Sequence, residues 1–100
     1  MRAWKLMRLR QDGTIGPLFC NATQRVPVGK WLWAEDHERA GFKHRPGWHA
    51  VPRRHAPHLT MKGRVWCRVE LKHVEKFDKP EAQGGRWLLA RRMRVLEVRP

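Results

Sequence analysis

The densest group of side chains suited to acid–base or metal chemistry lies in residues 42–58, FKHRPGWHAVPRRHAPH. This stretch holds four of the six histidines in the chain, together with three prolines and a tryptophan. The four are His44, His49, His55 and His58. Three interpretations compete for them: a metal site, an acid–base site, and a proline-stiffened basic loop.

A zinc site requires four donors in tetrahedral geometry, and Cys20 or Cys67 could complete a histidine set. The spacing of the histidines matches no His-x-x-x-His pair of one helix face, and nearby cations oppose a dication. Those cations are Lys43, Arg45, Arg53, Arg54 and Lys62. We therefore keep His44, His49, His55 and His58 only as candidate ligands and expect neither a metal nor another cofactor.

Acid–base cleavage of RNA is the enzymatic alternative. It needs a base, an acid and a cation that stabilises the pentavalent phosphate. His44, His49 and Arg45 have the required chemistry, so they are the candidate catalytic residues of a ribonuclease. Their composition is sufficient, but the sequence does not bring them together, and a non-catalytic protein is the preferred interpretation.

Binding through cations and an indole requires fewer coincidences. Residues 64–72 alternate with period two, which is typical of a strand with one buried face. The apolar face consists of Val65, Cys67, Val69 and Leu71. Arg64, Trp66 and Arg68 would share the opposite face, where an indole between two guanidinium groups can stack on a base and hold phosphates. Alternatively, Trp66 packs under a loop with the arginines around it.

Further arginines would extend this basic surface. The candidate nucleic-acid-binding residues are Arg53, Arg54, Arg64, Trp66, Arg68, Arg86, Arg91, Arg92 and Arg94. Trp31 and Trp33 are two apart, so they would share one face of a strand. Trp4 and either Trp31 or Trp33 have the bulk to fill a small core, and we expect core or interface packing for Trp31 and Trp33.

The charge balance indicates an anionic partner. The chain has 22 Lys and Arg against 9 Asp and Glu, a formal charge of +13. Such a surface attracts nucleic acid, or an acidic protein, in a salt-dependent way. Phosphate-binding, nucleophile-elbow and dinucleotide-binding glycine motifs are absent from the sequence. No apolar run approaches the ~20 residues of a membrane span, so we expect a cytoplasmic protein with no membrane contact.

The pattern predicts one domain over residues 1–100. Glycine and proline recur at the spacing of short strands, which favours a mainly β fold, β-rich α+β. We expect a small antiparallel sheet curled into a barrel or sandwich, with one or two short helices. Predicted strands cover 2–10, 26–34, 48–51 and 64–72, and the segment 86–98 would begin with a helical turn and end as a strand. We expect Cys20 and Cys67 to be reduced, and a disulfide between them is the alternative.

Five blocks of the chain resemble small uncharacterised proteins encoded by bacteriophages and prophages. The blocks are RAWKL, VPVGKWLWAE, RPGWHAV, GRVWCRVEL and ARRMRVLEV, in this order. The resemblance implies a compact β-rich domain in which Gly47-Trp48-His49 leads into a strand or loop. That group has no established activity, but phage accessory proteins commonly act on host nucleic acid or host defence. An anti-defence protein is therefore a second interpretation.

Overall fold

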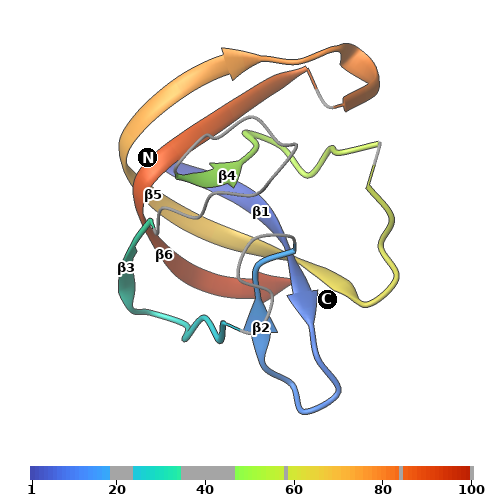
Figure 1. The fold of residues 1–100 in the computed structure, drawn as a ribbon, viewed down its shortest axis with the longest axis vertical. Coiled ribbons are helices and arrows are strands. Elements are labelled where there is room, and N and C mark those ends of the chain that lie inside the picture. Colours follow the sequence, from blue (N-terminus) through green and yellow to red (C-terminus); the bar gives the residue numbers. More distant parts are fainter. Residues whose placement is uncertain (19–23, 35–46, 58, 84, 100) are drawn as a thin grey trace, which may run out of the picture.

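Six strands build one antiparallel sheet in the structure, a computed structural model that describes residues 1–18, 24–34, 47–57, 59–83 and 85–99 (Figure 1). The strands are β1 (Arg2–Leu9), β2 (Ile15–Gly16), β3 (Trp31–Trp33), β4 (Trp48–Ala50), β5 (Arg64–Asp78) and β6 (Arg86–Arg99). Their order is β2-β1-β5-β6-β3, and β4 pairs with β6 as well. The mainly β prediction is thus confirmed.

The long hairpin of β5 and β6 is the spine of the sheet. It pairs from Asp78 opposite Arg86, next to its turn, to Trp66 opposite Arg99 at its open end. β1 pairs with the first half of β5, while β3 and β4 pair with successive parts of β6. The sheet curls into a half-barrel (Figure 1). A bridge between Trp4 and Val51, with N···O distances of 2.8 and 2.7 Å, brings its two sides together.

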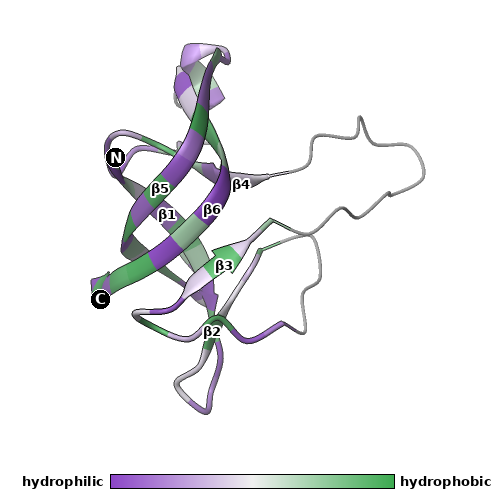
Figure 2. Ribbon diagram, turned by 90° about the vertical axis from the view of Figure 1, so that its left-hand side faces the viewer, coloured by the Kyte–Doolittle hydropathy of each residue, from purple (hydrophilic) through white to green (hydrophobic). Residues whose placement is uncertain are grey.

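The inner face of the half-barrel carries the main core. Val65, Cys67, Val69 and Leu71 are 0–3% exposed, as their period-two spacing predicts. The cluster also contains residues of β1, β2, β4 and β6, and Val26: Ala3, Met7, Ile15, Val26, Trp48, Ala50, Leu88, Ala90, Met93 and Val95. Figure 2 shows the matching alternation of hydrophobic and hydrophilic residues along β5 and β6.

A second, smaller hydrophobic cluster contains strand residues that lie next in sequence to residues of the main core. Val51, Ala56 and Trp87 are buried together, and Trp4 and Trp66 pack against them half-buried. Trp4 and Trp66 are neighbours in sequence of core residues on β1 and β5, so they project from the other side of the sheet. The segment that contains Val51 and Ala56 therefore covers part of the outer face.

The alternation of buried side chains changes phase in the middle of the hairpin. On β5 the buried positions are odd up to Leu71, but Val74 is the next residue packed on the core. On β6 the change falls between Met93 and Ala90. His73 lies at this point with a φ of 57°, a left-handed conformation that is uncommon outside glycine. The irregularity turns Lys72 and His73 both toward solvent.

Two of the local predictions are confirmed. The hairpin at Asp12-Gly13 joins β1 to β2, and the short strand near Trp48 is present. The helical turn expected at the start of β6 is wrong, because Arg86 onward is already paired with β5. Helix in the described ranges is confined to a 3₁₀ turn at Glu81–Gln83, and none there is long and apolar enough to cross a membrane.

Candidate nucleic-acid interface

The pairing of β3 with β6 brings two tryptophans beside two arginines. Trp31 lies opposite Arg94 and Trp33 lies opposite Arg92. Leu32, between the tryptophans, packs on the core, so both indoles project from the outer face. Trp33 is 60% exposed. Trp33 therefore does not fill the core, and the expectation that the two tryptophans share one face is confirmed.

The two rows continue across the hairpin to β5. Arg92 lies opposite Lys72, and Arg94 lies opposite Glu70. The outer face thus carries the rows Trp33–Arg92–Lys72 and Trp31–Arg94–Glu70. We call its aromatic and cationic members the aromatic–basic patch: Trp31, Trp33, Lys72, His73, Arg92 and Arg94.

Cations of the aromatic–basic patch lie over the indole rings. The Lys72 Nζ is 4.4 Å from the ring centroid of Trp31, and the Arg94 guanidinium carbon is 4.9 Å from it. The guanidinium carbon of Arg92 is 5.4 Å from the Trp31 centroid and 4.7 Å from that of Trp33. These separations lie within the ~6 Å range of cation–π attraction. The rings therefore hold a cluster of like charges together.

The Nε atoms of Arg92 and Arg94 are buried and have no hydrogen-bond partner among the residues that the structure describes. A buried polar group without a partner is costly unless another interaction compensates. Here the π face of Trp31 lies against both guanidinium groups. We conclude that Trp31 holds these arginines in place, while the more exposed Trp33 is available for contact.

Glu70 is the carboxylate at the edge of the aromatic–basic patch. Arg94 donates a hydrogen bond from Nη2 to its Oε1 at 2.5 Å, and this bond holds the pKa of Glu70 below its ordinary value. The carboxylate is therefore ionised and engaged at neutral pH. Its charge is paired with Arg94, whereas Lys72 and Arg92 face each other directly across the strands. Like charges in that position repel, which favours an external anion.

His73 lies next to the exposed indole. Its ring is nearly parallel to that of Trp33, at an interplanar angle of 11° and a centroid separation of 6.2 Å. The phase change in the hairpin is what places it there, because Lys72 and His73 both face solvent. Two roughly parallel aromatic rings beside three cations form a surface suited to flat anionic ligands.

The predicted Arg64–Trp66–Arg68 platform is not assembled as one surface. Trp66 is half-buried in the second cluster, in agreement with the alternative in which it packs under a loop. Arg68 instead lies over Trp4, with its guanidinium carbon 4.9 Å from the ring centroid, and Arg54 lies 4.8 Å from the same ring. Trp4 is thus covered by two guanidinium groups.

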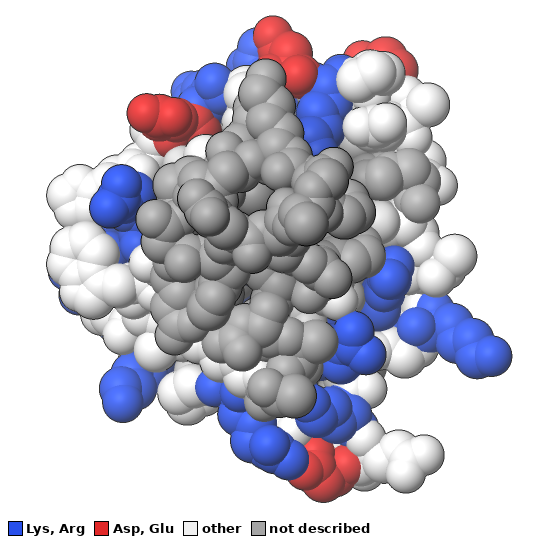
Figure 3. All heavy atoms as spheres, viewed as in Figure 1, with Lys and Arg blue, Asp and Glu red and all other residues white. Residues whose placement is uncertain are grey.

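The remaining candidate arginines are spread over the molecule. Arg86 makes a loose ion pair with Asp78 at 3.8 Å. Arg53 is exposed and lies in the segment between Val51 and Ala56. Arg91 is exposed beside Arg92 on β6, next to the aromatic–basic patch. Figure 3, viewed as in Figure 1, shows Lys and Arg prevailing over Asp and Glu on the coloured part of that side of the molecule.

The histidines that the structure describes do not converge. The His49 ring meets Phe77 edge-on at a centroid separation of 6.0 Å, and His55 is exposed. His44, Arg45 and His58 lie outside the described residues, as does Cys20. Within the described part of the chain, no three His, Cys, Asp or Glu residues are grouped as metal ligands would be.

Sequence reasoning missed Trp31 and Trp33 as surface residues, although a signal was present. Trp31-Leu32-Trp33 and Arg92-Met93-Arg94 have the same form, with an apolar residue between two residues that share the other face. Strands of matching pattern can pair so that the apolar centres meet, as Leu32 and Met93 do. Nothing local indicated that these two segments, about 60 residues apart, were partners.

Comparison with known proteins identifies no relative whose functional site could be transferred to this chain. The chain matches no protein-family model, no curated protein and no solved structure.

Proposed function

We propose that this protein binds nucleic acid without cleaving it, through the aromatic–basic patch. The observation that carries the proposal is the 60% exposure of Trp33 beside Arg92, 4.7 Å from its ring centroid. The exposed indole can stack on a base, and the formal charge of the chain, +13, attracts phosphates. Proteins that bind unpaired nucleic-acid strands use both of these interactions.

Single-stranded DNA or RNA suits this surface better than a duplex. Bases of a single strand are free to stack on an aromatic ring, and each such contact is worth about 1–3 kcal/mol. Arg92 and His73 lie beside the Trp33 ring, Lys72 lies opposite Arg92, and these side chains would contact adjacent phosphates. Because every base has a π face, the interaction would have little sequence preference.

The resemblance to phage and prophage proteins supplies the setting of the proposal. It supports a phage accessory protein that acts in the bacterial cytoplasm on host or phage nucleic acid. The same positive charge would also suit an acidic bacterial protein as partner. Capture from a bacterial lysate after nuclease treatment separates the two, because a protein partner would survive that treatment.

The ribonuclease alternative stays a prediction of the sequence. Two of its three residues, His44 and Arg45, lie outside the described residues. The described one, His49, contacts the Phe77 ring.

Fluorescence anisotropy of a labelled, unstructured oligonucleotide tests the proposal. We expect affinity to fall steeply as salt rises, since each phosphate contact contributes to the slope of log K against log salt. Trp33→Ala should weaken binding about tenfold, the loss of one stacked base. The variant should keep its fold because the side chain is largely exposed.

A charge-matched pair of variants provides the control. Lys72→Ala removes a cation of the aromatic–basic patch, whereas Lys76→Ala removes one from the same strand outside it. Lys72→Ala should weaken binding and reduce the salt slope more than Lys76→Ala does. Equal effects of the two, or absence of binding near physiological salt, would overturn the proposal.

A further inference from the structure

A second basic surface lies at the far end of β1 and at the start of β5. It is a cavity of about 590 Å³, open to solvent, a size typical of small-molecule sites. The residues that line it are Arg8, Leu9, Arg10, Gln11, Asp12, Leu18, Lys62, Gly63 and Arg64. We call it the β1–β5 cavity. None of the aromatic–basic patch residues lines it.

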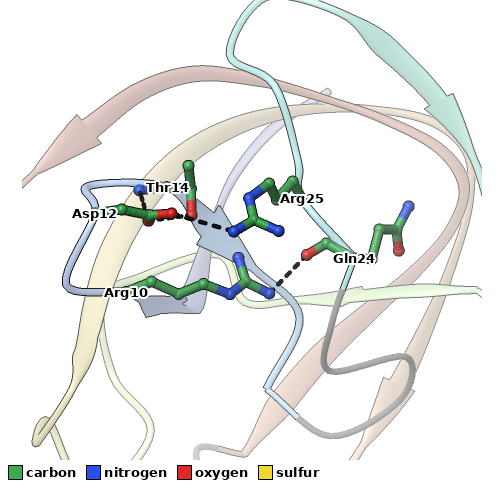
Figure 4. A network of polar contacts seen from close by, with 5 residues as sticks. All are labelled: Arg10, Asp12, Thr14, Gln24 and Arg25. Carbon is green, nitrogen blue, oxygen red and sulfur yellow. Dashed lines mark hydrogen bonds and ion pairs between the residues drawn. The ribbon is translucent and has the colours of Figure 1, made fainter.

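The lining of the β1–β5 cavity is strongly positive. Four of its residues are cationic and one, Asp12, is acidic, which gives a formal charge of +3. Both oxygens of Asp12 are already engaged: Thr14 donates to Oδ1 from its backbone N and its hydroxyl, at 3.0 and 2.6 Å, and Arg25 donates to Oδ2 at 3.1 Å (Figure 4). The carboxylate is thus committed to Arg25, which does not line the cavity.

Two of the cations are set directly opposite each other by the sheet. Arg8 of β1 pairs with Arg64 of β5, an arrangement that is unfavourable for like charges. Side-chain hydrogen bonds to backbone carbonyls hold both arginines: Arg8 donates to Leu18 at 2.9 Å and Arg64 donates to Thr60 at 3.1 Å. These hydrogen bonds hold both guanidinium groups at the lining of the cavity, where they can donate further hydrogen bonds to a phosphate group.

Gly63 forms part of the wall of the β1–β5 cavity, in the turn before β5. It has a φ of +68°, and no heavy atom of the described residues lies within 4 Å of where its Cβ would be. Its carbonyl accepts a hydrogen bond from the N of Leu9 at 2.9 Å, which ties the turn before β5 to the end of β1. Lys62 and Arg64 flank this glycine, so the turn places both cations at the cavity.

We propose that the β1–β5 cavity binds a phosphate group, and a phosphate monoester in preference to a diester. Guanidinium groups match the oxygen geometry of phosphate, and charge-assisted hydrogen bonds of this kind are among the stronger ones. A monoester carries close to two negative charges at neutral pH, whereas a diester carries one. The formal +3 lining therefore favours the monoester. Its source is a free nucleotide or the 5′ end of a strand.

NMR titration with inorganic phosphate at constant ionic strength tests the site without any nucleic acid. We expect saturable shifts of the Gly63 and Arg64 amides that sodium chloride does not reproduce. Arg8→Gln should weaken phosphate binding about tenfold. Lys62→Ala should weaken it by a smaller factor, and Lys76→Ala, the charge-matched control on β5, should leave it unchanged.

The outcome is independent of the aromatic–basic patch. Trp33→Ala should bind phosphate like the parent protein, so loss of nucleic-acid binding and loss of phosphate binding are separable. A 5′-phosphorylated oligonucleotide that binds more tightly than its 5′-hydroxyl form, only when Arg8 is present, identifies the strand end as the source. Preference for adenosine monophosphate without that difference identifies the nucleotide. The proposal would be refuted if dimethyl phosphate bound as tightly as inorganic phosphate. It would also be refuted if Lys62→Ala and Lys76→Ala weakened phosphate binding equally.

Discussion

An indole beside guanidinium groups can be either a structural support or a ligand surface, depending on how much of the ring is covered. Trp4 is half-buried, with Arg54 and Arg68 over it at 4.8 and 4.9 Å, and it packs in the second cluster. Trp33 has comparable cationic contact but is 60% exposed. The same residue type therefore stabilises the fold at one position and is offered to solvent at the other.

Gly16 is required because Arg10 and Gln24 approach its backbone. A Cβ there would lie 2.4 Å from the Arg10 Nη2 and 2.4 Å from the carbonyl oxygen of Gln24, which are hydrogen-bonded to each other at 2.8 Å. We predict that Gly16→Ala lowers the free energy of unfolding by about 1–3 kcal/mol through this clash. Urea denaturation followed by circular dichroism measures it.

Gly13→Ala is the matched control for that substitution. Gly13 has a φ of +86° and open space around its Cβ position, so alanine there meets only the strain of a left-handed conformation, about 1 kcal/mol. Gly16→Ala should cost more than Gly13→Ala. Parent-like stability of Gly16→Ala would show that Arg10 does not pass so close to this strand.

The Cys67 thiol should be inert in the folded protein. It is fully buried in the core, and burial raises its pKa to about 11. Because the thiolate is the reactive form, we predict that a Cys20→Ser variant does not react with Ellman's reagent at about pH 8 until it is unfolded. Absorbance of the released thionitrobenzoate, with and without guanidinium chloride, measures this. Rapid reaction of the native variant would contradict the buried position.

At the scale of strands, period-two patterning accounts for much of the fold. The alternation around Val65 and Cys67 correctly predicted the first part of β5 and its buried face, although the strand continues to Asp78, and Asp12-Gly13 correctly predicted a hairpin. The partnership of β3 with β6 was out of reach, because register between distant segments is set by tertiary packing. For that reason the candidate arginines 92 and 94 were found but their indole partners were not.

The phase change in the β5–β6 hairpin depends on the conformation of one residue. His73 adopts a φ of 57°, which costs about 1–2 kcal/mol for a residue with a Cβ. We predict that His73→Gly is as stable as the parent or up to about 1 kcal/mol more stable, whereas His73→Val loses about 1–2 kcal/mol. Thermal unfolding followed by circular dichroism compares the variants.

Glu75→Val is the control for the valine substitution. Glu75 is exposed on the same strand and its φ is not positive, and valine favours strands. Its stability should match or exceed that of the parent. If His73→Val proved equally well tolerated, the left-handed conformation would not be a fixed feature of β5.

For the molecule as a whole, charge repulsion opposes folding and the few carboxylates offset it. The chain has only nine acidic residues against 22 Lys and Arg. Two of them are held ionised by their partners: Asp12 by Thr14 and Arg25, and Glu70 by Arg94. In acid these carboxylates become neutral, so the molecule loses attraction while the repulsion among its Lys and Arg residues remains.

Acid should therefore destabilise this protein, and Asp12 should account for a definite part of the effect. Hydrogen bonds from Thr14, and then from Arg25, hold the pKa of Asp12 far below its usual range. A carboxylate whose pKa is lower in the folded state contributes stability above its unfolded pKa, near 4, and loses that contribution as pH falls toward the folded value. We predict that Asp12→Asn lowers the urea midpoint at neutral pH. The difference from the parent should shrink progressively below about pH 4. Urea titrations of both proteins from neutral pH into strong acid measure it. A pH-independent difference would mean that the carboxylate acts through its shape and hydrogen bonds rather than its charge, and that the hairpin does not rely on the ion pair with Arg25.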